Sequence, residues 1–241
     1  MKIYDTLIIG SCYRALGYAL TRPDTVIIEE RELCDVQLCL PIYSFEKEKY
    51  EPKTALGKSL RGYFENLSLY CENMQNTTAL EMGFCGFASD FNALILLKCR
   101  AVSTTLCDGY YDVKTVCGAG IEHIFAKRVI DMRSVGKTRS LTMLFTAESE
   151  QECSKVAHAF PDAVTEPAFY NGRYAIHVRL EDDENRLTGA ERLYKRFLDC
   201  DAQVKLIHIA YTALENGSDV DFGGPIAALE EGVRLASEVT Q

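Results

Sequence analysis

Residues 1–30 constrain the fold more strongly than any other part of the chain. Residues 3–9 (IYDTLII) are mostly apolar and rich in β-branched side chains, and Gly10 follows them directly, which predicts a short buried strand. Residues 12–20 (CYRALGYAL) predict a short helix, and residues 25–28 (TVII) predict a second strand after a Pro-Asp break. A strand, a glycine turn, a helix and a strand in this order form a βαβ unit, which gives parallel strands joined by a right-handed crossover.

The turn between the first strand and the helix has the layout of a dinucleotide-binding turn. Such a turn needs a glycine for the tight bend, a second glycine where the backbone approaches a pyrophosphate, and a third small residue where the helix meets the strand. Gly10 takes the first position and Ala15 the third, whereas Cys12 takes the second. The helix start would direct amides and the positive end of its dipole at an anion. We expect the Cys12 side chain to occupy space that a pyrophosphate would otherwise fill.

Acidic residues stand at the end of the second predicted strand. Glu29 follows Gly10 by 19 residues, close to the roughly 20 expected of a carboxylate that hydrogen-bonds a ribose. Glu30 is the next residue, and Arg14 lies beside the expected phosphate position, where its guanidinium would pair with an anion. The alternatives are a structural turn without a ligand, a solvated strand end and a surface arginine. Order and spacing together favour nucleotide binding.

The middle of the chain passes from a helical to a β-rich pattern. Residues 31–51 show no clean period and predict a connecting loop, and residues 52–70 predict a helix with one apolar face. Three β-rich runs follow, at residues 93–106, 110–117 and 123–132. An Asp-Gly dipeptide separates the first two, which is a strong hairpin signal. These runs predict an antiparallel meander whose last strand re-enters the main sheet.

The last part of the chain predicts a second layer and a closing helix. Residues 138–211 have the order βαββαβ, which indicates a small α+β layer, ferredoxin-like in order, inserted into the first domain. The predicted domains are therefore 1–137 with 212–241, and 138–211. A helix begins at Pro225 after two glycines, and apolar residues recur along one of its faces.

Three segments carry a family resemblance. They are DTLIIGSCYRALGYAL with TVIIEE, IFAKRVIDMRSVG, and GGPIAALEEGVRLA. In that order they resemble the N-terminal βαβ unit, the strand that returns from the meander, and the last helix of the FAD-dependent oxidoreductases of the two-dinucleotide-binding-domain type. In the second segment, the residues that match the family pattern are Ala126, Val129, Ile130, Asp131 and Gly136, whereas Met132 and Arg133 replace small residues.

The resemblance implies a Rossmann-like FAD/NAD(P)-binding α/β fold with an antiparallel β-meander and a small inserted α+β layer. It implies FAD as the cofactor, with the flavin carrying redox chemistry on an unidentified small molecule. The residues that it assigns to cofactor binding are Gly10, Ser11, Cys12, Tyr13, Arg14, Ala15, Glu29, Glu30, Gly223, Gly224 and Pro225. No catalytic acid or base follows from it.

The chain also departs from the family pattern. Cys12 replaces the second glycine, the loop after Glu30 lacks the glycine-rich turn that packs against a flavin ring, and no Gly-Asp dipeptide ends the last strand. These departures support an alternative, a non-catalytic relative that has lost FAD and acts as a binding or partner protein, as a homo-oligomer or a subunit. A nicotinamide-nucleotide binder that uses the same turn is a third hypothesis.

Composition excludes several other classes. The net charge is -9, from 35 acidic and 26 basic residues, and nucleic-acid binding needs a basic surface instead. The longest apolar runs are a few residues, far short of the ~20 that cross a bilayer. The N-terminus goes straight into a strand pattern and has no secretory leader pattern. We therefore predict a cytoplasmic protein without nucleic-acid or membrane partners.

The ten cysteines indicate free thiols. No Cys-x-x-Cys occurs and no Cys/His cluster has zinc-ligand spacing, so we predict neither a disulfide framework nor a metal site. Most lie inside apolar runs, where cysteine behaves as a small hydrophobic residue. Cys34 and Cys39 fall in the loop that would approach a flavin ring. A redox-active thiol there is one hypothesis, and an ordinary thiol is the other.

Overall fold

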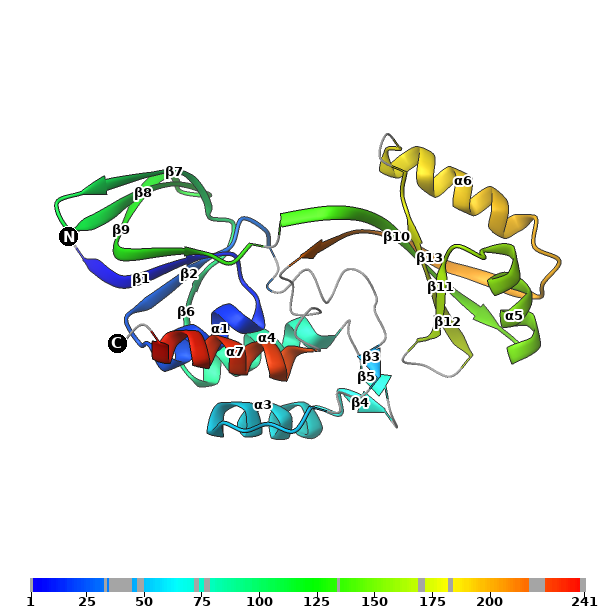
Figure 1. Ribbon diagram of the computed structural model, residues 1–241, viewed down its shortest axis with the longest axis horizontal. Coiled ribbons are helices and arrows are strands. Elements are labelled where there is room, and N and C mark those ends of the chain that lie inside the picture. Colours follow the sequence, from blue (N-terminus) through cyan, green and yellow to red (C-terminus); the bar gives the residue numbers. More distant parts are fainter. Residues whose placement is uncertain are drawn as a thin grey trace.

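The computed structural model describes residues 2–32, 34, 45–46, 50–71, 74–75, 79–133, 135–168, 172–181, 184–216 and 224–238. Figure 1 shows a large sheet with helices below it, and a second sheet with its own helices, joined to the first by two long strands. Parallel and antiparallel strands both occur. The predicted fold class, α/β with an antiparallel meander and an additional α+β layer, is confirmed.

The large sheet has six strands in the order β6-β2-β1-β9-β8-β7. Their bounds are β1 (Ile3–Ile9), β2 (Thr25–Ile28), β6 (Leu94–Leu96), β7 (Arg100–Cys107), β8 (Tyr110–Cys117) and β9 (Gly120–Asp131). β6, β2, β1 and β9 are parallel, whereas β7, β8 and β9 form an antiparallel meander. The prediction that the last meander strand re-enters the main sheet is confirmed, because β9 pairs with β1.

The register brings the ends of three parallel strands level. Ile9 lies beside Ile28 of β2 and beside Asp131 of β9. Gly10 and Glu29, which follow two of these residues, therefore leave the sheet at the same edge. The carboxyl edge of a parallel sheet is where open α/β folds bind their ligands.

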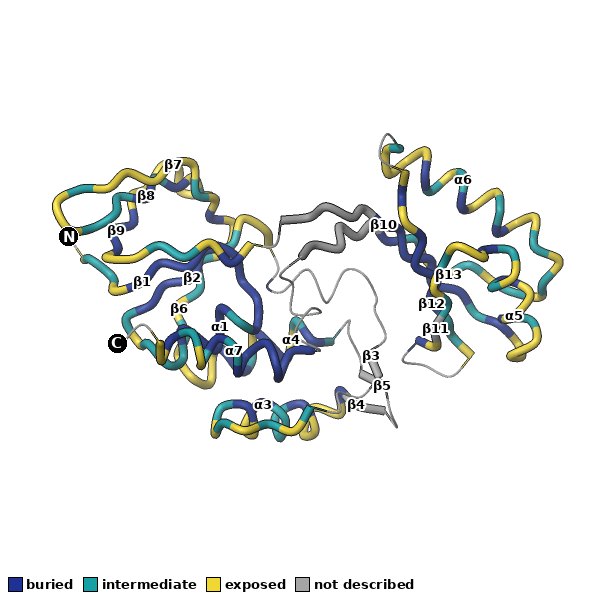
Figure 2. The backbone as a smooth tube through the Cα atoms, in the orientation of Figure 1, coloured by how far each residue is buried: buried dark blue, intermediate teal, exposed yellow. Residues whose placement is uncertain are grey.

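Four helices accompany this sheet: α1 (Tyr13–Thr21), α3 (Ala55–Asn66), α4 (Leu80–Asp90) and α7 (Pro225–Glu238). In Figure 1 they lie below the sheet, with α3 farthest from it. One buried cluster joins all four helices, and it includes Tyr13, Leu16, Leu60, Phe64, Leu80, Phe84, Phe87, Ile226 and Leu229. Figure 2 shows the second half of β1 and the first turns of α7 as buried. The core of this part of the protein therefore lies between the sheet and α3.

Helices α1 and α7 pack so closely that glycine is required on both. A Cβ on Gly17 of α1 would overlap the carbonyl oxygen of Leu229, and a Cβ on Gly232 of α7 would overlap the carbonyl oxygen of Arg14. Beyond these contacts, Nε and Nη2 of Arg22 donate to the carbonyl oxygen of Ala236 at 3.1 and 2.9 Å. This bond satisfies one of the carbonyls that the end of a helix leaves without a partner.

Glu230 ties α7 to the start of α3. The side chain is buried, and its carboxylate accepts hydrogen bonds from Tyr50 Oη (2.6 Å), from the amide nitrogens of Lys53 and Thr54 (2.7 and 2.5 Å) and from Thr54 Oγ1 (2.8 Å). Burial by itself raises the pKa of the Glu230 carboxyl, but the hydrogen bonds outweigh it and the pKa lies below its ordinary value. A buried carboxylate thus holds two helices together.

The second sheet has four antiparallel strands in the order β11-β12-β10-β13. The elements are β10 (Val135–Ala147), α5 (Glu150–Ala159), β11 (Val164–Pro167), β12 (Arg173–Arg179), α6 (Arg186–Leu198) and β13 (Val204–Asn216). The predicted βαββαβ order is confirmed, and this layer has its own buried cluster around Phe145, Val156 and Leu193. The domain boundaries at residues 137 and 212 stay a prediction.

A third, small sheet has the order β3-β5-β4. Its strands are two residues each, β3 (Phe45–Glu46), β4 (Tyr70–Cys71) and β5 (Met74–Gln75). The loop predicted over residues 31–51 falls mostly outside the described residues, and Cys39 is among those that are not described.

The helix predicted over residues 52–70 is shorter than expected. Thr54 starts α3, because its Oγ1 accepts a hydrogen bond from the Gly57 amide at 2.9 Å. The apolar face predicted for this helix consists of Leu56, Leu60, Phe64 and Leu67, but the helix ends before Leu67, which is 46% exposed. At Ser68 the backbone turns to a φ of 53°. A local capping bond and a left-handed turn therefore override the apolar period.

Two further segments differ from the sequence prediction. The β-rich run at residues 93–106 is two strands, β6 and β7, which separate near Lys98, where φ is 53°. Helix α4 was not predicted. Its buried residues recur at helical spacing (Leu80, Gly83, Phe84, Phe87 and Ala88), but two further apolar residues, Met82 and Cys85, lie on the exposed side and obscure the period.

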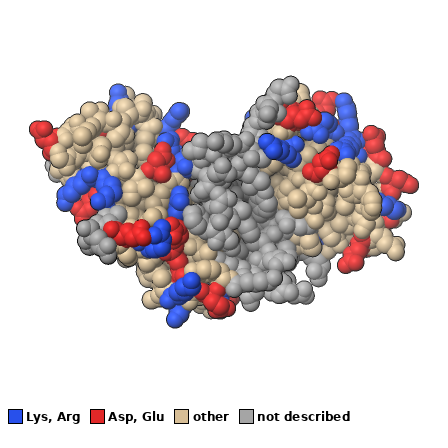
Figure 3. Space-filling view, in the orientation of Figure 1, with Lys and Arg blue, Asp and Glu red and all other residues tan. Residues whose placement is uncertain are grey.

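The described residues were also compared with the requirements for a membrane-spanning helix and for a metal site. None of the described helices is long and apolar enough to span a membrane. Among the described residues, no group of three or more His, Cys, Asp and Glu side chains is arranged to hold a metal ion. Figure 3 shows basic and acidic side chains interspersed on the visible face of both layers.

We expect Gly17→Ala to destabilise the protein. The added methyl would meet the Leu229 carbonyl, and overpacking of this kind costs about 1–3 kcal/mol of unfolding free energy. Gly62 of α3 is the matched control, because nothing lies within 4 Å of the position that its added methyl would take, and Gly→Ala in an open helix stabilises by about 0.5–1 kcal/mol. Urea unfolding measures both changes, and equal effects of the two substitutions would contradict the packing.

We expect the contribution of Glu230 to stability to depend on pH. Because its pKa is lowered on folding, the contribution is present above the ordinary carboxyl pKa of about 4.5 and is lost as the pH falls through the lower folded value. Glu230→Gln should reduce the unfolding free energy by about 1–3 kcal/mol near neutrality and by less in acid. Glu231→Gln, next to it and partnered by an exposed Arg234, should cost about 0–1 kcal/mol. Urea unfolding across the pH range measures this.

Candidate functional site

The turn after β1 is built around a glycine that no other residue replaces without strain. Gly10 has a φ of 99°, and its amide donates to the Ile28 carbonyl oxygen at 2.8 Å, which ties the turn to the end of β2. A Cβ on Gly10 would lie 2.9 Å from the backbone nitrogen and from Cγ of Arg133. The backbone therefore needs glycine for its conformation and for the close approach of Arg133.

Glu29 lies directly against this turn. Its Oε2 accepts hydrogen bonds from the amide and the hydroxyl of Ser11, at 2.9 and 3.0 Å, and its Oε1 accepts one from the Arg31 amide at 3.0 Å. The structure thus brings together the glycine turn and the carboxylate that the sequence assigned to a ribose. Because a carboxylate offers about four acceptor positions, three bonds leave room for one more donor.

Cys12 caps the first helix. It is the N-cap residue of α1, and its Sγ accepts a hydrogen bond from the Ala15 amide at 3.4 Å. The side chain is 3% exposed and lies in a buried cluster with Ile8, Ile27 and Met132. The thiol is therefore part of the interior and engages one first-turn amide through sulfur, a weak acceptor. Whether it also limits the space for a pyrophosphate stays a prediction.

The next residues of the turn have different environments. Tyr13 is fully buried, donates from its hydroxyl to the Leu80 carbonyl oxygen at 2.8 Å, and packs edge-on against Phe64 and Phe84. Ala15 is also fully buried, as expected of the small residue where helix meets strand. The side chain of Tyr13 is thus a core residue, and only its backbone is available to a ligand.

Arg14 is partly buried and Glu30 is exposed. The pKa of the Glu231 carboxyl on α7 lies below its ordinary value, mainly because Arg234 hydrogen-bonds to it and partly because Arg14 is near. Glu30 is exposed and lies 3.8 Å from Nε of Arg100. The positive charge of Arg14 is thus close enough to the Glu231 carboxylate of α7 to stabilise it.

Arg133 is a residue of this site that the sequence assigned no role. It packs against Gly10, and it forms a two-pronged ion pair with Asp131, with Nε–Oδ1 and Nη2–Oδ2 distances of 2.9 and 2.6 Å. The hydrogen bonds from Arg133 lower the pKa of Asp131, and the bond to Asp131 raises the pKa of Arg133. The sequence did hold one signal for a special role of this residue: Arg133 stands where the family pattern has a small residue.

The start of α7 completes the site. Gly223 lies outside the described residues. Gly224 is buried with a φ of 131° and accepts a hydrogen bond from the Ala228 amide at 3.0 Å, and Pro225 is the buried first residue of the helix. In Figure 1, α1 and α7 begin on the same side of the sheet, and their first turns share one buried cluster. Two helix N-termini therefore open near the carboxyl edge, and each favours an anion.

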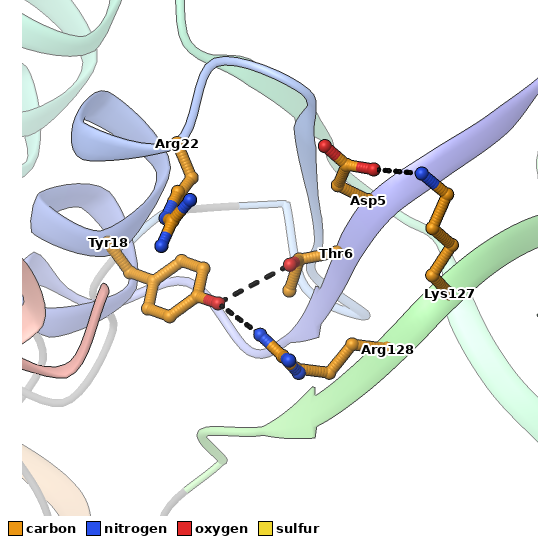
Figure 4. Close-up of a pocket in the computed structure, with 6 residues that line it drawn as sticks. All are labelled: Asp5, Thr6, Tyr18, Arg22, Lys127 and Arg128. Atoms are coloured by element: carbon orange, nitrogen blue, oxygen red, sulfur yellow. Dashed lines mark hydrogen bonds and ion pairs between the residues drawn. The ribbon is translucent and has the colours of Figure 1, made fainter. Parts of the chain in front are cut away.

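A polar pocket at the other end of α1 has a structural explanation. Figure 4 shows Asp5, Thr6, Tyr18, Arg22, Lys127 and Arg128 around a cavity of about 210 Å³. Lys127 pairs with Asp5 at 2.7 Å, and Arg22 hydrogen-bonds to the end of α7. The cavity lies where two helices end, and the C-terminal end of a helix dipole repels anions. The basic side chains around this cavity thus offset the negative charge of Asp5 and of the two helix ends.

Comparison with known proteins identifies the fold. No family model and no curated protein matches the chain. The p-nitrophenol 4-monooxygenase PnpA from Pseudomonas putida matches with a TM-score of 0.62 at 11% identity, over 98% of this chain and 78% of its own. The anhydrotetracycline hydroxylase OxyS from Streptomyces rimosus matches with a TM-score of 0.62 at 11% identity, over 99% of this chain and 63% of its own.

A third match is aklavinone-11 hydroxylase, solved in a ternary complex with FAD and aklavinone. Its TM-score is 0.58 at 13% identity, over 99% of this chain and 63% of its own. The chain thus spans less than two thirds of the length of both hydroxylases. The protein has the fold of FAD-dependent monooxygenases.

We expect Gly10→Ala to destabilise the protein more than the same change in an open turn. Gly109, in the β7–β8 hairpin, is the control, because it also has a positive φ (83°) but has nothing within 4 Å of a Cβ. Both substitutions should cost about 1–2 kcal/mol of backbone strain. The contact with Arg133 should add about 1 kcal/mol or more at position 10. Chemical denaturation compares the two variants, and a smaller loss at Gly10 would contradict this geometry.

Proposed function

We propose that this protein is a small FAD-dependent oxidoreductase-like protein that acts on an unidentified small molecule. The observation that carries the proposal is the meeting of two helix N-termini, a glycine turn and the Glu29 carboxylate at the carboxyl edge of the parallel strands. A bound flavin would supply the two-electron chemistry, and the protein would supply binding and orientation.

Each part of the site is proposed to hold one part of the cofactor. The backbone amides that open α1 would hold the diphosphate, since a helix start favours phosphate. Glu29 has one acceptor position left for a ribose hydroxyl, and Ser11 fixes its orientation. The start of α7, from Gly224, would face the flavin end. Arg133, beside Gly10, adds a positive charge near the diphosphate position.

A second candidate is the non-catalytic relative that has lost FAD. The observation that favours it is that groups expected to contact the cofactor already have partners inside the protein. The Ala15 amide donates to Cys12, and the Glu29 carboxylate accepts three hydrogen bonds. Arg133 also pairs with Asp131, so its charge is partly neutralised. A protein of this kind would use the same fold as a binding or partner protein.

Addition of FAD to the purified protein separates the two candidates. The proposed function predicts visible flavin bands that stay with the protein through gel filtration, and a higher melting temperature with FAD. A ligand that binds only the native state stabilises it by about 2.7 kcal/mol at a concentration of 100 times its Kd. A colourless protein whose melting temperature neither FAD nor NAD moves would support the relative without FAD. A shift with NAD alone would support a nicotinamide-nucleotide binder.

Substitution of Cys12 tests the position of the diphosphate. Cys12→Ala releases the Ala15 amide from the thiol, and Cys12→Gly also removes the Cβ. If the thiol competes with the cofactor, both variants should bind FAD about tenfold more tightly, the effect of about 1.4 kcal/mol. Cys153→Ala, a buried cysteine in the other layer, is the control and should leave FAD affinity unchanged. Unchanged affinity in both Cys12 variants would place the diphosphate elsewhere.

A further inference from the structure

The cavity of Figure 4 lies at the other end of α1 from the proposed cofactor site. Its volume of about 210 Å³ is far more than the ~10–15 Å³ that one water needs, and less than the roughly 300–1,000 Å³ of pockets for drug-sized ligands. The cavity therefore has room for a small ligand. Its lining residues come from three elements: Asp5 and Thr6 from β1, Tyr18 and Arg22 from the end of α1, and Lys127 and Arg128 from β9.

The cavity has more positive charge than its structural role uses. Among the described residues that line it, three are basic and one, Asp5, is acidic. A helix end carries about half a negative elementary charge, so two helix ends and Asp5 come to roughly two negative charges against three positive. Arg22 donates to the Ala236 carbonyl oxygen at the end of α7, and Lys127 pairs with Asp5 at 2.7 Å. These contacts account for two of the cations and leave Arg128.

Arg128 lines the cavity with most of its donors uncommitted in the described structure. Its Nη1 donates to Tyr18 Oη at 3.4 Å, and no described carboxylate lies close enough to it for an ion pair. A guanidinium has five N–H donors. The pKa of Asp5 lies below its ordinary value, mainly because Lys127 bonds to it and partly because Arg22 and Arg128 are near. The positive charge of Arg128 therefore acts inside the cavity.

Two buried hydroxyls meet Arg128 at one point. Tyr18 is 1% exposed and Thr6 is 3% exposed, and their side-chain oxygens lie 3.4 Å apart. Figure 4 shows Tyr18 Oη between Thr6 and Arg128. Hydrogen bonds of hydroxyls are typically about 2.7–2.8 Å long, and those of N–H donors about 2.9–3.0 Å, so both contacts of Tyr18 Oη are weak. A ligand oxygen in the cavity would give these groups a partner at full strength.

A third hydroxyl beside them lacks a partner. Thr25 is the register partner of Thr6 on β2, and it is 3% exposed. Its Oγ1 is buried, and no group of the described structure hydrogen-bonds to it. Register partners project from the same face of a sheet, so this hydroxyl lies next to Thr6. A buried hydroxyl without a partner is uncommon in proteins. The β1–β2 side of the cavity thus favours a polar ligand.

We propose that this cavity binds a phosphate group, either the free ion or that of a small phosphomonoester, with Arg128, Lys127 and Tyr18 as its donors. This inference goes beyond the proposed function, and it holds with or without a bound flavin.

The directions of the donors favour phosphate over a carboxylate. The Thr6 and Tyr18 hydroxyls and the two basic side chains of β9 reach the cavity from three different elements. A carboxylate presents two oxygens in one plane, whereas the oxygens of a phosphate point in several directions. An arginine fork binds phosphate through two parallel hydrogen bonds, and a lysine binds it as a point charge. One arginine and one lysine from adjacent positions of β9 match this chemistry.

Titration of the full chain with inorganic phosphate tests the proposal. Isothermal titration calorimetry at constant ionic strength, with chloride as the balancing anion, should show one saturable site per chain, since charge screening is then the same throughout. Glycerol 3-phosphate is the second probe. Tighter binding than that of phosphate identifies a phosphomonoester site, and equal or weaker binding identifies the free ion. No saturable heat with either probe, or acetate binding as tightly as phosphate, would overturn the proposal.

Substitutions with opposite effects assign the binding to the cavity. Arg128→Gln should weaken phosphate binding about tenfold, and Tyr18→Phe, which keeps the buried ring, about threefold. Asp5→Asn should strengthen binding, because it removes the acidic lining residue and releases Lys127. Arg179→Gln, at an exposed arginine of the other layer, is the matched control and should leave the affinity unchanged. Circular dichroism checks that each variant is folded. Equal affinity in the wild type and in Arg128→Gln would contradict the assignment.

A titration in the presence of FAD separates this site from the proposed cofactor site. FAD carries phosphate groups itself, so it would compete with phosphate if both bound at the start of α1. We expect the same affinity for phosphate with and without FAD. Displacement of phosphate by FAD would place the phosphate at the carboxyl edge and overturn the assignment to the cavity. A chain that binds phosphate but not FAD would contradict the proposed function and support this inference.

Discussion

The level ends of β1, β2 and β9 are the constraint from which the rest of the site follows. Because Ile9, Ile28 and Asp131 are register partners, Gly10, Glu29 and the residues after Asp131 leave the sheet together. Hydrogen bonds then close the edge: the Gly10 amide bonds to Ile28, and Ser11 bonds to Glu29. A shift of one strand by one residue would separate these groups and turn their side chains to the other face. The backbone pairing thus determines which side chains meet.

The helical layer depends in turn on very close backbone contact. Gly17 and Gly232 allow α1 and α7 to touch without intervening side chains, and Glu230 extends the same contact to α3. This packing places the first turns of α1 and α7 at one edge of the sheet. The positive ends of two helix dipoles are therefore brought together by residues that would touch no ligand themselves.

The sequence predicted those parts of the structure that depend on local patterns. The βαβ unit, the meander with its Asp108-Gly109 turn and the βαββαβ layer follow from apolar period and turn residues, and the structure confirms them. The spacing of Gly10 and Glu29 also predicted that they belong to one site. Contacts between distant segments could not be predicted in this way. Arg133 packs on Gly10, and Arg22 hydrogen-bonds to Ala236, only because segments far apart in the sequence fold together. Helix α4 was missed because Met82 and Cys85, apolar residues on its exposed side, obscure the period of its buried face.

The pairing of α1 with α7 also has a kinetic consequence. The hydrogen bonds from Arg22 to Ala236 join residues that are 214 positions apart. The face of α1 around Gly17 is thus synthesised long before α7, the helix that packs on it. Contacts of such long range are slow to form, because the loop between them must close first. During synthesis on the ribosome, the face of α1 around Gly17 therefore stays without its α7 partner until the four-stranded layer has been synthesised.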